Sequence, residues 1–230
     1  MKYKSGIIIF SSINWSTHNQ LHHELSNYFS KNGHKILFIE NTGTRSISIY
    51  DYRRILHRIK KWFGSNLGFS NTNNDITIFT PFFLPFQFIN IFVKINTFLI
   101  YNSIKKWINY NNASPIIVIS FLPNPLTFNI CKKIDNKILI YYCADDMISN
   151  SNKTTILQKI EQDLVEISDI NFYTSNKLGE KFREFSNKSF LIRNGVSFER
   201  FYNSINEKIY PKFYNHQDTI IGYVGAIRTI

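Results

Sequence analysis

The feature that most constrains the fold is the regular alternation of short, continuous apolar runs with longer segments whose apolar residues recur at helical spacing. Continuous apolar runs are typical of strands buried on both faces, because a strand with one wet face alternates apolar and polar residues. Strands that alternate with helices form a parallel sheet covered on both sides. We therefore predict an α/β domain with a doubly wound parallel sheet, whose seven strands lie at residues 7–10, 35–40, 76–80, 115–121, 137–143, 170–175 and 189–196.

Helical periodicity and capping residues place helices between these strands. One helix is predicted to stop at Asn32-Gly33, a typical C-terminal cap, after four residues at helical spacing: Leu21, Leu25, Tyr28 and Phe29. A long helix is expected over about residues 86–111, and Pro125 can begin a short one. A further helix is predicted to bury one face made of Ile156, Ile160, Leu164 and Ile167.

The carboxyl-terminal part of the chain shows a change of pattern. Residues 203–218 follow neither the helical nor the strand period and contain Pro211, which is typical of a linker. The next residues, TIIGYVGAIRTI, contain a buried-strand pattern followed by Gly225, where a tight turn is expected. The predicted organisation is one domain over 1–202, a linker over 203–218, and the first strand of a second domain over 219–230.

Charge and cysteine content restrict the class of protein. The formal net charge is +11, which favours an anionic partner, although a basic surface without a dedicated partner explains it equally well. The basic residues are dispersed, and no nucleic-acid-binding motif occurs, so nucleic acid is not an expected partner. Cys131 and Cys143 are too few for a disulfide framework and fit the core of a cytosolic protein.

Two stretches raise the question of a membrane. Residues 82–104 are long and apolar but contain Lys94 near their middle, so we expect a partly buried or interface-lying helix and not a spanning one. Residues 53–63 mix apolar side chains with five cations that suit an anionic membrane surface: Arg53, Arg54, Arg58, Lys60 and Lys61. The alternative for this second stretch is a solvated basic helix. A peripheral location at the inner face of the membrane is the resulting expectation.

Three loops follow predicted strands at the sheet edge where ligands of doubly wound domains bind. Residues 11–20 carry no glycine fingerprint for a dinucleotide, and their small polar residues and Trp15 can line a sugar pocket or form an ordinary packed loop. Asp145 and Asp146 end a strongly apolar strand, where a carboxylate can bind hydroxyls or accept a proton, or merely cap a turn. Asn194-Gly195 predicts a sharp turn with left-handed backbone geometry.

The histidines give a weak metal signal. His18 and His22 lie one helical turn apart, with His23 and Glu24 beside them. Their order differs from HExxH, and no distant ligand is evident, so no metal site is expected. Phosphate-binding loops, cysteine ligand pairs and nucleophile elbows are also absent from the sequence.

Taken in order, several stretches resemble the amino-terminal half of GT-B glycosyltransferases, most of all the family 4-like enzymes of teichuronic acid and surface-polysaccharide synthesis. The resemblance is carried by Trp15, the NQLHHELSNYFSKNGHKILFIE segment (19–40), IYYCADDM (140–147), EQDLVEISDINFYTSNKLGEKF (161–182), LIRNGVSFERF (191–201) and IGYVGAI (221–227). Such enzymes have two Rossmann-like domains with the active site between them. The resemblance implies an acceptor-side domain here and a truncated donor-binding domain.

The resemblance also implies roles for individual residues. Asp145 or Asp146 would contact the acceptor or the transferred sugar as catalytic residues, and Ser12, Trp15 and Gln20 would surround the acceptor. Asn194, Gly195 and Gly225 would lie near the donor at the domain junction. The expected activity is sugar transfer from a nucleotide-sugar donor to a hydroxyl of a lipid-linked or glycan acceptor, without cofactor or metal. This chain alone is expected to be inactive; the alternative is a non-catalytic acceptor-binding half that needs a separate donor-binding subunit.

Overall fold

The computed structural model describes residues 5–17, 19–41, 68–72, 75–84, 88–148, 154–195 and 198–204. The chain divides into two compact units, Met1–Asn194 and Gly195–Ile230. The second unit contributes one described helix, α7 (Phe198–Ser204). The basic stretch 53–63, the linker from residue 205 onward and Gly225 lie outside the described residues. The predicted domain boundaries therefore stay predictions.

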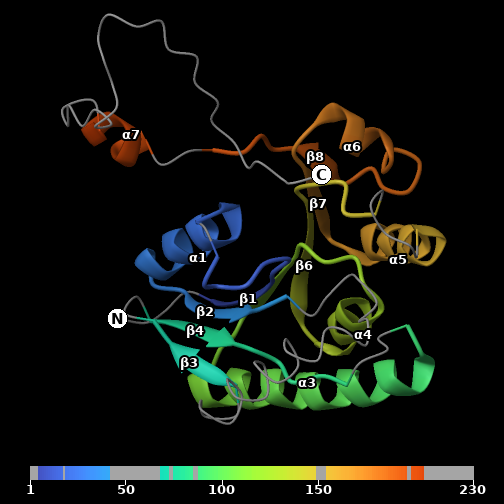
Figure 1. The fold of residues 1–230 in the computed structure, drawn as a ribbon, viewed down its shortest axis with the longest axis horizontal. Coiled ribbons are helices and arrows are strands. Elements are labelled where there is room, and N and C mark those ends of the chain that lie inside the picture. Colours follow the sequence, from blue (N-terminus) through green and yellow to red (C-terminus); the bar gives the residue numbers. More distant parts are fainter. Residues whose placement is uncertain are drawn as a thin grey trace, which may run out of the picture. The chain divides into compact units, whose positions relative to one another are not determined.

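The first unit contains one mostly parallel sheet (Figure 1). Its eight described strands lie in the order β3-β4-β2-β1-β5-β6-β7-β8, and only the β3–β4 pair is antiparallel. Their bounds are β1 Gly6–Phe10, β2 Lys35–Ile39, β3 Phe69–Asn71, β4 Ile76–Phe79, β5 Ile116–Ser120, β6 Lys137–Cys143, β7 Ile170–Tyr173 and β8 Ser189–Leu191. In the centre, Ile8 of β1 lies in register between Leu37 of β2 and Val118 of β5.

The strand order confirms the predicted doubly wound sheet. From β1 the chain builds β2 and then β4 on one side, returns to β5 on the other side of β1, and continues outward through β6, β7 and β8. The carboxyl ends of the parallel strands consequently share one edge, where such folds place their ligand sites. All seven predicted strands are present. The last one is shorter than predicted, since β8 ends at Leu191, and β3 was not predicted.

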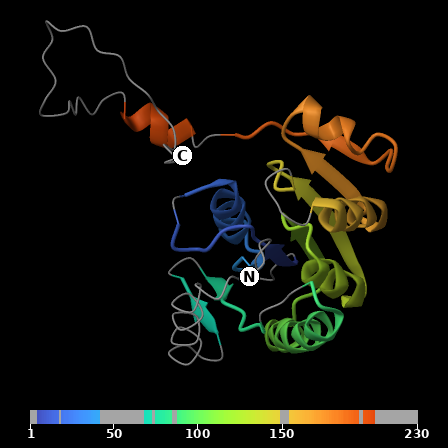
Figure 2. The same cartoon turned by 45° about the vertical axis from the view of Figure 1, so that its right-hand side comes forward.

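Helices cover both faces of the sheet. Their bounds are α1 Leu21–Lys31, α3 Asn90–Asn111, α4 Pro125–Lys133, α5 Thr154–Ile167 and α6 Asn176–Glu180. Figures 1 and 2 show α1 on one face, with α3, α4 and α5 on the other. Two buried clusters separate accordingly: Ile8 and Phe10 of β1 belong to one, and Ile7 and Ile9 to the other. The central strand is thus buried on both faces, as its continuous apolar run predicts.

The predicted helix ends are confirmed where capping residues signal them. Helix α1 ends at its C-cap Asn32, and Gly33 has φ +84°, a left-handed conformation that glycine adopts without a steric cost. Helix α4 begins at Pro125, and the side chain of Asn124 accepts a hydrogen bond from the Thr127 N–H at 2.8 Å. Pro125 has no N–H to leave unpaired in that first turn, which explains its place there.

The predicted buried face of α5 is wrong by part of a turn. Ile156 and Ile167 are exposed, whereas Leu157, Leu164 and Val165 are buried. The remaining buried position on this face belongs to Glu161, whose carboxyl accepts a hydrogen bond from a core tyrosine. A count of apolar spacing does not include a polar residue that is buried through a hydrogen bond. The predicted face of α5 is therefore rotated relative to the face that is buried.

Helix α3 confirms the expectation of a partly buried helix in the apolar stretch around Lys94. One side of the helix packs into the core through Ile100, Ile104 and Trp107. Within the described part of the chain, no helix has both the length and the apolar character needed to cross a bilayer. Both cysteines are buried and free, as predicted for core residues.

Candidate functional site

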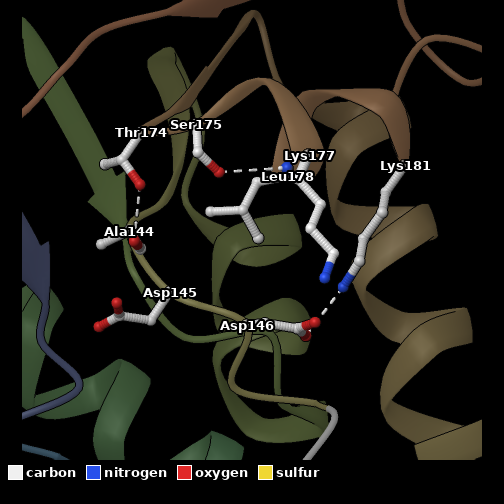
Figure 3. A pocket seen from close by; sticks show the side chains of 8 residues that line it. All are labelled: Ala144, Asp145, Asp146, Thr174, Ser175, Lys177, Leu178 and Lys181. Atoms are coloured by element: carbon white, nitrogen blue, oxygen red, sulfur yellow. Dashed lines mark hydrogen bonds and ion pairs between the residues drawn. The ribbon is translucent and has the colours of Figure 1, made fainter.

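A pocket lies at the carboxyl ends of the neighbouring strands β6 and β7 (Figure 3). Its volume is about 300 Å³, and it opens to solvent. The lining residues come from the turn after β6 and from the end of β7 with α6: Ala144, Asp145, Asp146, Thr174, Ser175, Lys177, Leu178 and Lys181. Pockets of roughly 300–1,000 Å³ are typical of small-molecule sites, so this one suits a small ligand.

Two hydroxyl groups shape the rim of the pocket. The Thr174 hydroxyl donates to the Ala144 carbonyl oxygen at 2.8 Å, which ties the end of β7 to the end of β6. The neighbouring Ser175 is the N-cap of α6, and its side-chain oxygen accepts from the Leu178 N–H at 3.4 Å. The Thr174 hydroxyl therefore links the ends of β6 and β7, and the Ser175 cap fixes the first turn of α6.

The two carboxylates of the pocket point in different directions, as expected for adjacent residues (Figure 3). Asp146 forms an ion pair with Lys181 at 2.8 Å, and both side chains are about one-third exposed, at 33% and 38%. Lys177 and Lys181, one helical turn apart, extend toward Asp146. Asp145 is exposed, and its carboxylate makes no hydrogen bond or ion pair with any residue that the structure describes. It is the group available to a ligand hydroxyl.

Beneath the pocket lies a buried group of titratable residues. The Tyr141 hydroxyl donates to Glu161 Oε1 at 2.5 Å, and the Cys143 thiol lies 3.8 Å from the same oxygen. Glu161 is 7% exposed, and Tyr141 and Cys143 are buried with it. Two donors converge on one carboxyl oxygen, which fixes α5, the source of Glu161, against β6.

The pKa values of these groups shift because they are buried. Burial raises the pKa of Glu161, while the Tyr141 hydrogen bond and the nearby Lys181 charge partly oppose that shift. Burial also raises the pKa of Tyr141 and of Cys143, and the Glu161 carboxyl adds to both effects. A thiol and a phenol with raised pKa remain neutral near pH 7, so neither is an activated nucleophile.

The loop after β1 carries the predicted acceptor-binding residues Ser12, Trp15 and Gln20, and it is held by many internal bonds. The Trp15 N–H donates to Glu40 Oε1 at 3.0 Å, and the Thr80 hydroxyl donates to Glu40 Oε2 at 2.7 Å. The Trp15 ring lies 4.9 Å from the Phe38 ring, centre to centre, and packs against the second core cluster. The acceptor-binding role predicted for Ser12, Trp15 and Gln20 stays a prediction, since no ligand contact tests it.

Two histidines of α1 hold this loop from the helix side. His23 Nδ1 accepts from the Gln20 N–H at 3.1 Å, so the proton of the neutral ring is on Nε2, which donates to the Trp15 carbonyl oxygen at 3.1 Å. His22 Nε2 lies 3.1 Å from Ser12 Oγ. Burial, assisted by His23, lowers the pKa of His22 to about 4, so its ring is neutral at pH 7.

Of the remaining predicted site residues that the structure describes, Asn194 and Gly195 do not line the pocket. Asn194 and Gly195 are exposed, and the left-handed geometry predicted for them is wrong, because neither has a positive φ. Directly after β8, the Ile192 N–H donates to the Tyr173 carbonyl oxygen at 2.9 Å. Outside the undescribed positions, which include His18, no three His, Cys, Asp or Glu side chains gather as a metal site would require.

Sequence reasoning about single residues missed most of the pocket wall. Thr174 and Ser175 were predicted only as the end of a strand, and Lys177 and Lys181 were singled out only within the stretch that carries the family resemblance. The signal that identifies them is topological: two hydroxyl residues end the strand next to the one that carries the aspartates, and two lysines follow at a spacing of one turn. Recognising it requires knowing that β6 and β7 are neighbours.

No family model and no curated protein matches the sequence. Among solved structures, sucrose-phosphate synthase from Thermosynechococcus elongatus matches with a TM-score of 0.56 and 10% identity. The match covers 85% of this chain and 49% of that protein, so this chain spans about half the length of the matched enzyme. A second sucrose-phosphate synthase structure from that organism matches with a TM-score of 0.49 and 10% identity, over 88% of this chain and 96% of the other. The fold is therefore Rossmann-like and similar to that of the matched part of the sucrose-phosphate synthase.

Proposed function

We propose that this chain is the acceptor-side half of a glycosyltransferase and that the pocket at the ends of β6 and β7 binds a sugar. The observation that carries the proposal is the placing of two aspartates, with two lysines facing one of them, at the carboxyl edge of a glycosyltransferase-like sheet. Ligands of doubly wound domains bind at this edge. Carboxylates accept hydrogen bonds from sugar hydroxyls, and an exposed one can also take a proton from an attacking hydroxyl.

The two carboxylates of the pocket have different roles in this proposal. Asp146 is neutralised and oriented by Lys181, so it is suited to hold a hydroxyl in a fixed direction. Asp145 has no such partner among the described residues, so it is the candidate base for the acceptor hydroxyl. In this proposal the reaction moves a sugar from a nucleotide donor to a glycan or lipid-linked acceptor. The finer assignment to teichuronic acid or surface-polysaccharide synthesis is supported only by the resemblance of the sequence motifs.

The alternative proposal is a non-catalytic acceptor-binding half that works with a separate donor-binding chain. The match covers 49% of the sucrose-phosphate synthase chain, which fits both proposals equally. The two proposals share the pocket and differ in turnover. Neither predicts transfer of radiolabelled sugar from nucleotide sugars to glycan or lipid-extract acceptors by this chain alone, and only the alternative predicts that transfer appears when a separately expressed donor-binding chain is added.

The proposed site is tested with Asp145→Asn and Asp146→Asn. Saturation-transfer NMR with mono- and disaccharides is expected to show binding by the wild-type chain and at least tenfold weaker binding by Asp146→Asn, because the negative charge and the ion pair with Lys181 that orients the side chain are lost. Glu184→Gln, an exposed carboxylate of the same unit that does not line the pocket, is the matched control. Unchanged sugar binding, and unchanged transfer if any is detected, by both aspartate variants would show that the acidic pair is structural.

A further inference from the structure

Helix α3 exposes apolar side chains on the side that faces away from the core. Ile91, Ile95, Phe98 and Leu99 are 58%, 39%, 62% and 42% exposed. They recur at helical spacing, opposite the buried side that packs into the core through Ile100 and other residues. A helix that covers a core normally has a polar outer side. We call the exposed side, with its flanking lysines, the outer face of α3.

All the charges of α3 are positive. Its 22 residues include Lys94, Lys105 and Lys106, each exposed, and neither an aspartate nor a glutamate. Lys132 and Lys133, also exposed, add cations at the end of the neighbouring helix α4, and Lys133 lies 5.9 Å from the centre of the Tyr101 ring of α3. The apolar face is therefore accompanied by cations on its own helix and on the helix beside it.

The lysines share the exposed side with the apolar residues. At 3.6 residues per turn, Lys94 and Phe98 lie one turn apart, and Lys105 continues the same side two turns further on. With a rise of about 1.5 Å per residue, the apolar part from Ile91 to Leu99 extends roughly 12 Å along the helix. Figure 1 shows α3 at the outside of the described part of the first unit, with α4 against its inner side.

We propose that the outer face of α3 binds an anionic lipid surface, with the helix lying in the plane of the membrane. In this arrangement the apolar side chains enter the boundary between headgroups and acyl chains, and the lysine stems extend alongside them to the lipid phosphates. The helix does not cross the bilayer, because its other side is committed to the protein core. The inference goes beyond the proposed sugar transfer and does not depend on it.

A lipid surface fits the outer face better than a second copy of the chain does. A two-fold symmetric contact through α3 would place two identical sets of exposed lysines in one interface, with no acid on either helix to pair with them. Like charges facing each other weaken such a contact, whereas an anionic bilayer attracts each lysine. Charge complementarity therefore favours the membrane as the occupant.

Flotation of the full chain with vesicles tests the proposal. We expect binding to vesicles of phosphatidylcholine with 30–40% phosphatidylglycerol, roughly, and little binding to phosphatidylcholine alone, with the difference reduced at high salt. The pair Ile91→Ser and Phe98→Ser should lower the partition coefficient about tenfold or more. Each of Lys94→Gln, Lys105→Gln and Lys106→Gln should lower it about fivefold. Tyr28→Ser, which removes a 63% exposed aromatic ring from α1, and Lys31→Gln are the matched controls.

A fluorescent label reports whether this face is the part that enters the lipid. Because Cys131 and Cys143 are buried, a cysteine introduced by Phe98→Cys can be labelled selectively with an environment-sensitive dye. Anionic vesicles should shift its emission to the blue, and the same dye at Tyr28→Cys should not respond. The proposal is overturned if the wild-type chain does not bind anionic vesicles, or if binding survives the α3 substitutions unchanged. It is also overturned if sedimentation shows that those substitutions instead abolish a dimer.

Discussion

Two loops at the same edge of the sheet carry small polar residues directly after a strand, and they differ in whether those residues are engaged by the rest of the fold. The loop after β1 is closed on itself: Glu40, His22 and His23 engage its side chains or backbone, and Trp15 packs onto the core. The ends of β6 and β7 leave a pocket in which Asp145 faces solvent. Polar residues at a strand end therefore indicate a site only where the surrounding structure leaves their functional groups unused.

The largest effect is expected where the loop after β1 is anchored. Glu40→Ala removes the acceptor of both the Trp15 N–H and the Thr80 hydroxyl, at a residue that is 3% exposed. Buried donors left without partners cost about 1–3 kcal/mol each, so we expect a loss of roughly 3 kcal/mol in the free energy of unfolding. Urea unfolding measures it. Glu40→Gln should lose less, and Glu184→Ala almost nothing; a cost below about 1 kcal/mol for Glu40→Ala would show that the loop does not depend on this carboxyl.

The next effect is a dependence on pH at the same loop. The pKa of His22 is about 4 in the folded protein, against an ordinary value of 6.5. Between pH 4 and pH 6.5 the His22 ring is protonated in the unfolded chain and neutral in the folded chain, so acid favours unfolding. The contribution of the neutral His22 ring to the free energy of unfolding is fully present above pH 6.5, and the free energy of unfolding falls by about 3 kcal/mol on going to pH 4. The difference in unfolding free energy between wild type and His22→Gln should change over this window. A difference that is constant with pH would contradict the burial of a neutral ring.

The β6–β7 edge should respond to acid in the opposite sense. The raised pKa of Glu161 means that the folded chain holds its proton to a higher pH than the unfolded chain, whose value is near 4.5. The resulting stabilisation is complete at low pH and is lost as the pH rises through the folded pKa. Glu161→Gln keeps an acceptor for Tyr141, so it should be more favourable relative to wild type at pH 7 than at pH 4. Urea unfolding at both pH values checks this sign.

Glu161→Ala separates the hydrogen bond from the charge. It leaves the buried Tyr141 hydroxyl without its acceptor, so it should destabilise the fold more than Glu161→Gln at both pH values. Equal stability of the alanine and glutamine variants would show that the contact between Tyr141 and Glu161 contributes little.

The smallest effects on stability are expected in the pocket itself. Asp146→Asn breaks an ion pair whose side chains are one-third exposed, and such pairs contribute about 0–1 kcal/mol. Asp145→Asn changes an exposed carboxylate and should leave the free energy of unfolding almost unchanged. Thermal unfolding of the two variants checks both values. A loss above about 2 kcal/mol for either one would mark the pair as part of the folding core and weaken its assignment to ligand binding.

Most of the sheet was predictable from the sequence, because its strands are continuous apolar runs between clear helix signals. Strand β3 was missed since it has three residues, two of them exposed, and pairs antiparallel at the sheet edge. The face of α5 was misassigned because Glu161 is buried there through a bond to Tyr141, a residue 20 positions away in sequence. Spacing along one helix contains no information about such a partner.

The candidate site was predictable only in part for the same reason. The aspartates could be located because they end a strongly apolar strand, and their divergent directions follow from adjacent positions. Lys181, the partner of Asp146, comes from a different strand–helix unit, and its role depends on β6 and β7 being neighbours in the sheet. Conversely, nothing in the spacing of Ser12, Trp15 and Gln20 reveals that buried Glu40 and His23 hold their loop.

The most direct test of the proposed sugar pocket is a map of amide chemical-shift changes on titration with the sugar that binds best. The pocket proposal predicts that the changes concentrate at residues 144–147 and 174–181, from both sides of the pocket, while residues 11–17 change little. Changes centred on the loop after β1, or none at residues 144–147, would contradict the assignment of the pocket between β6 and β7 as the sugar site.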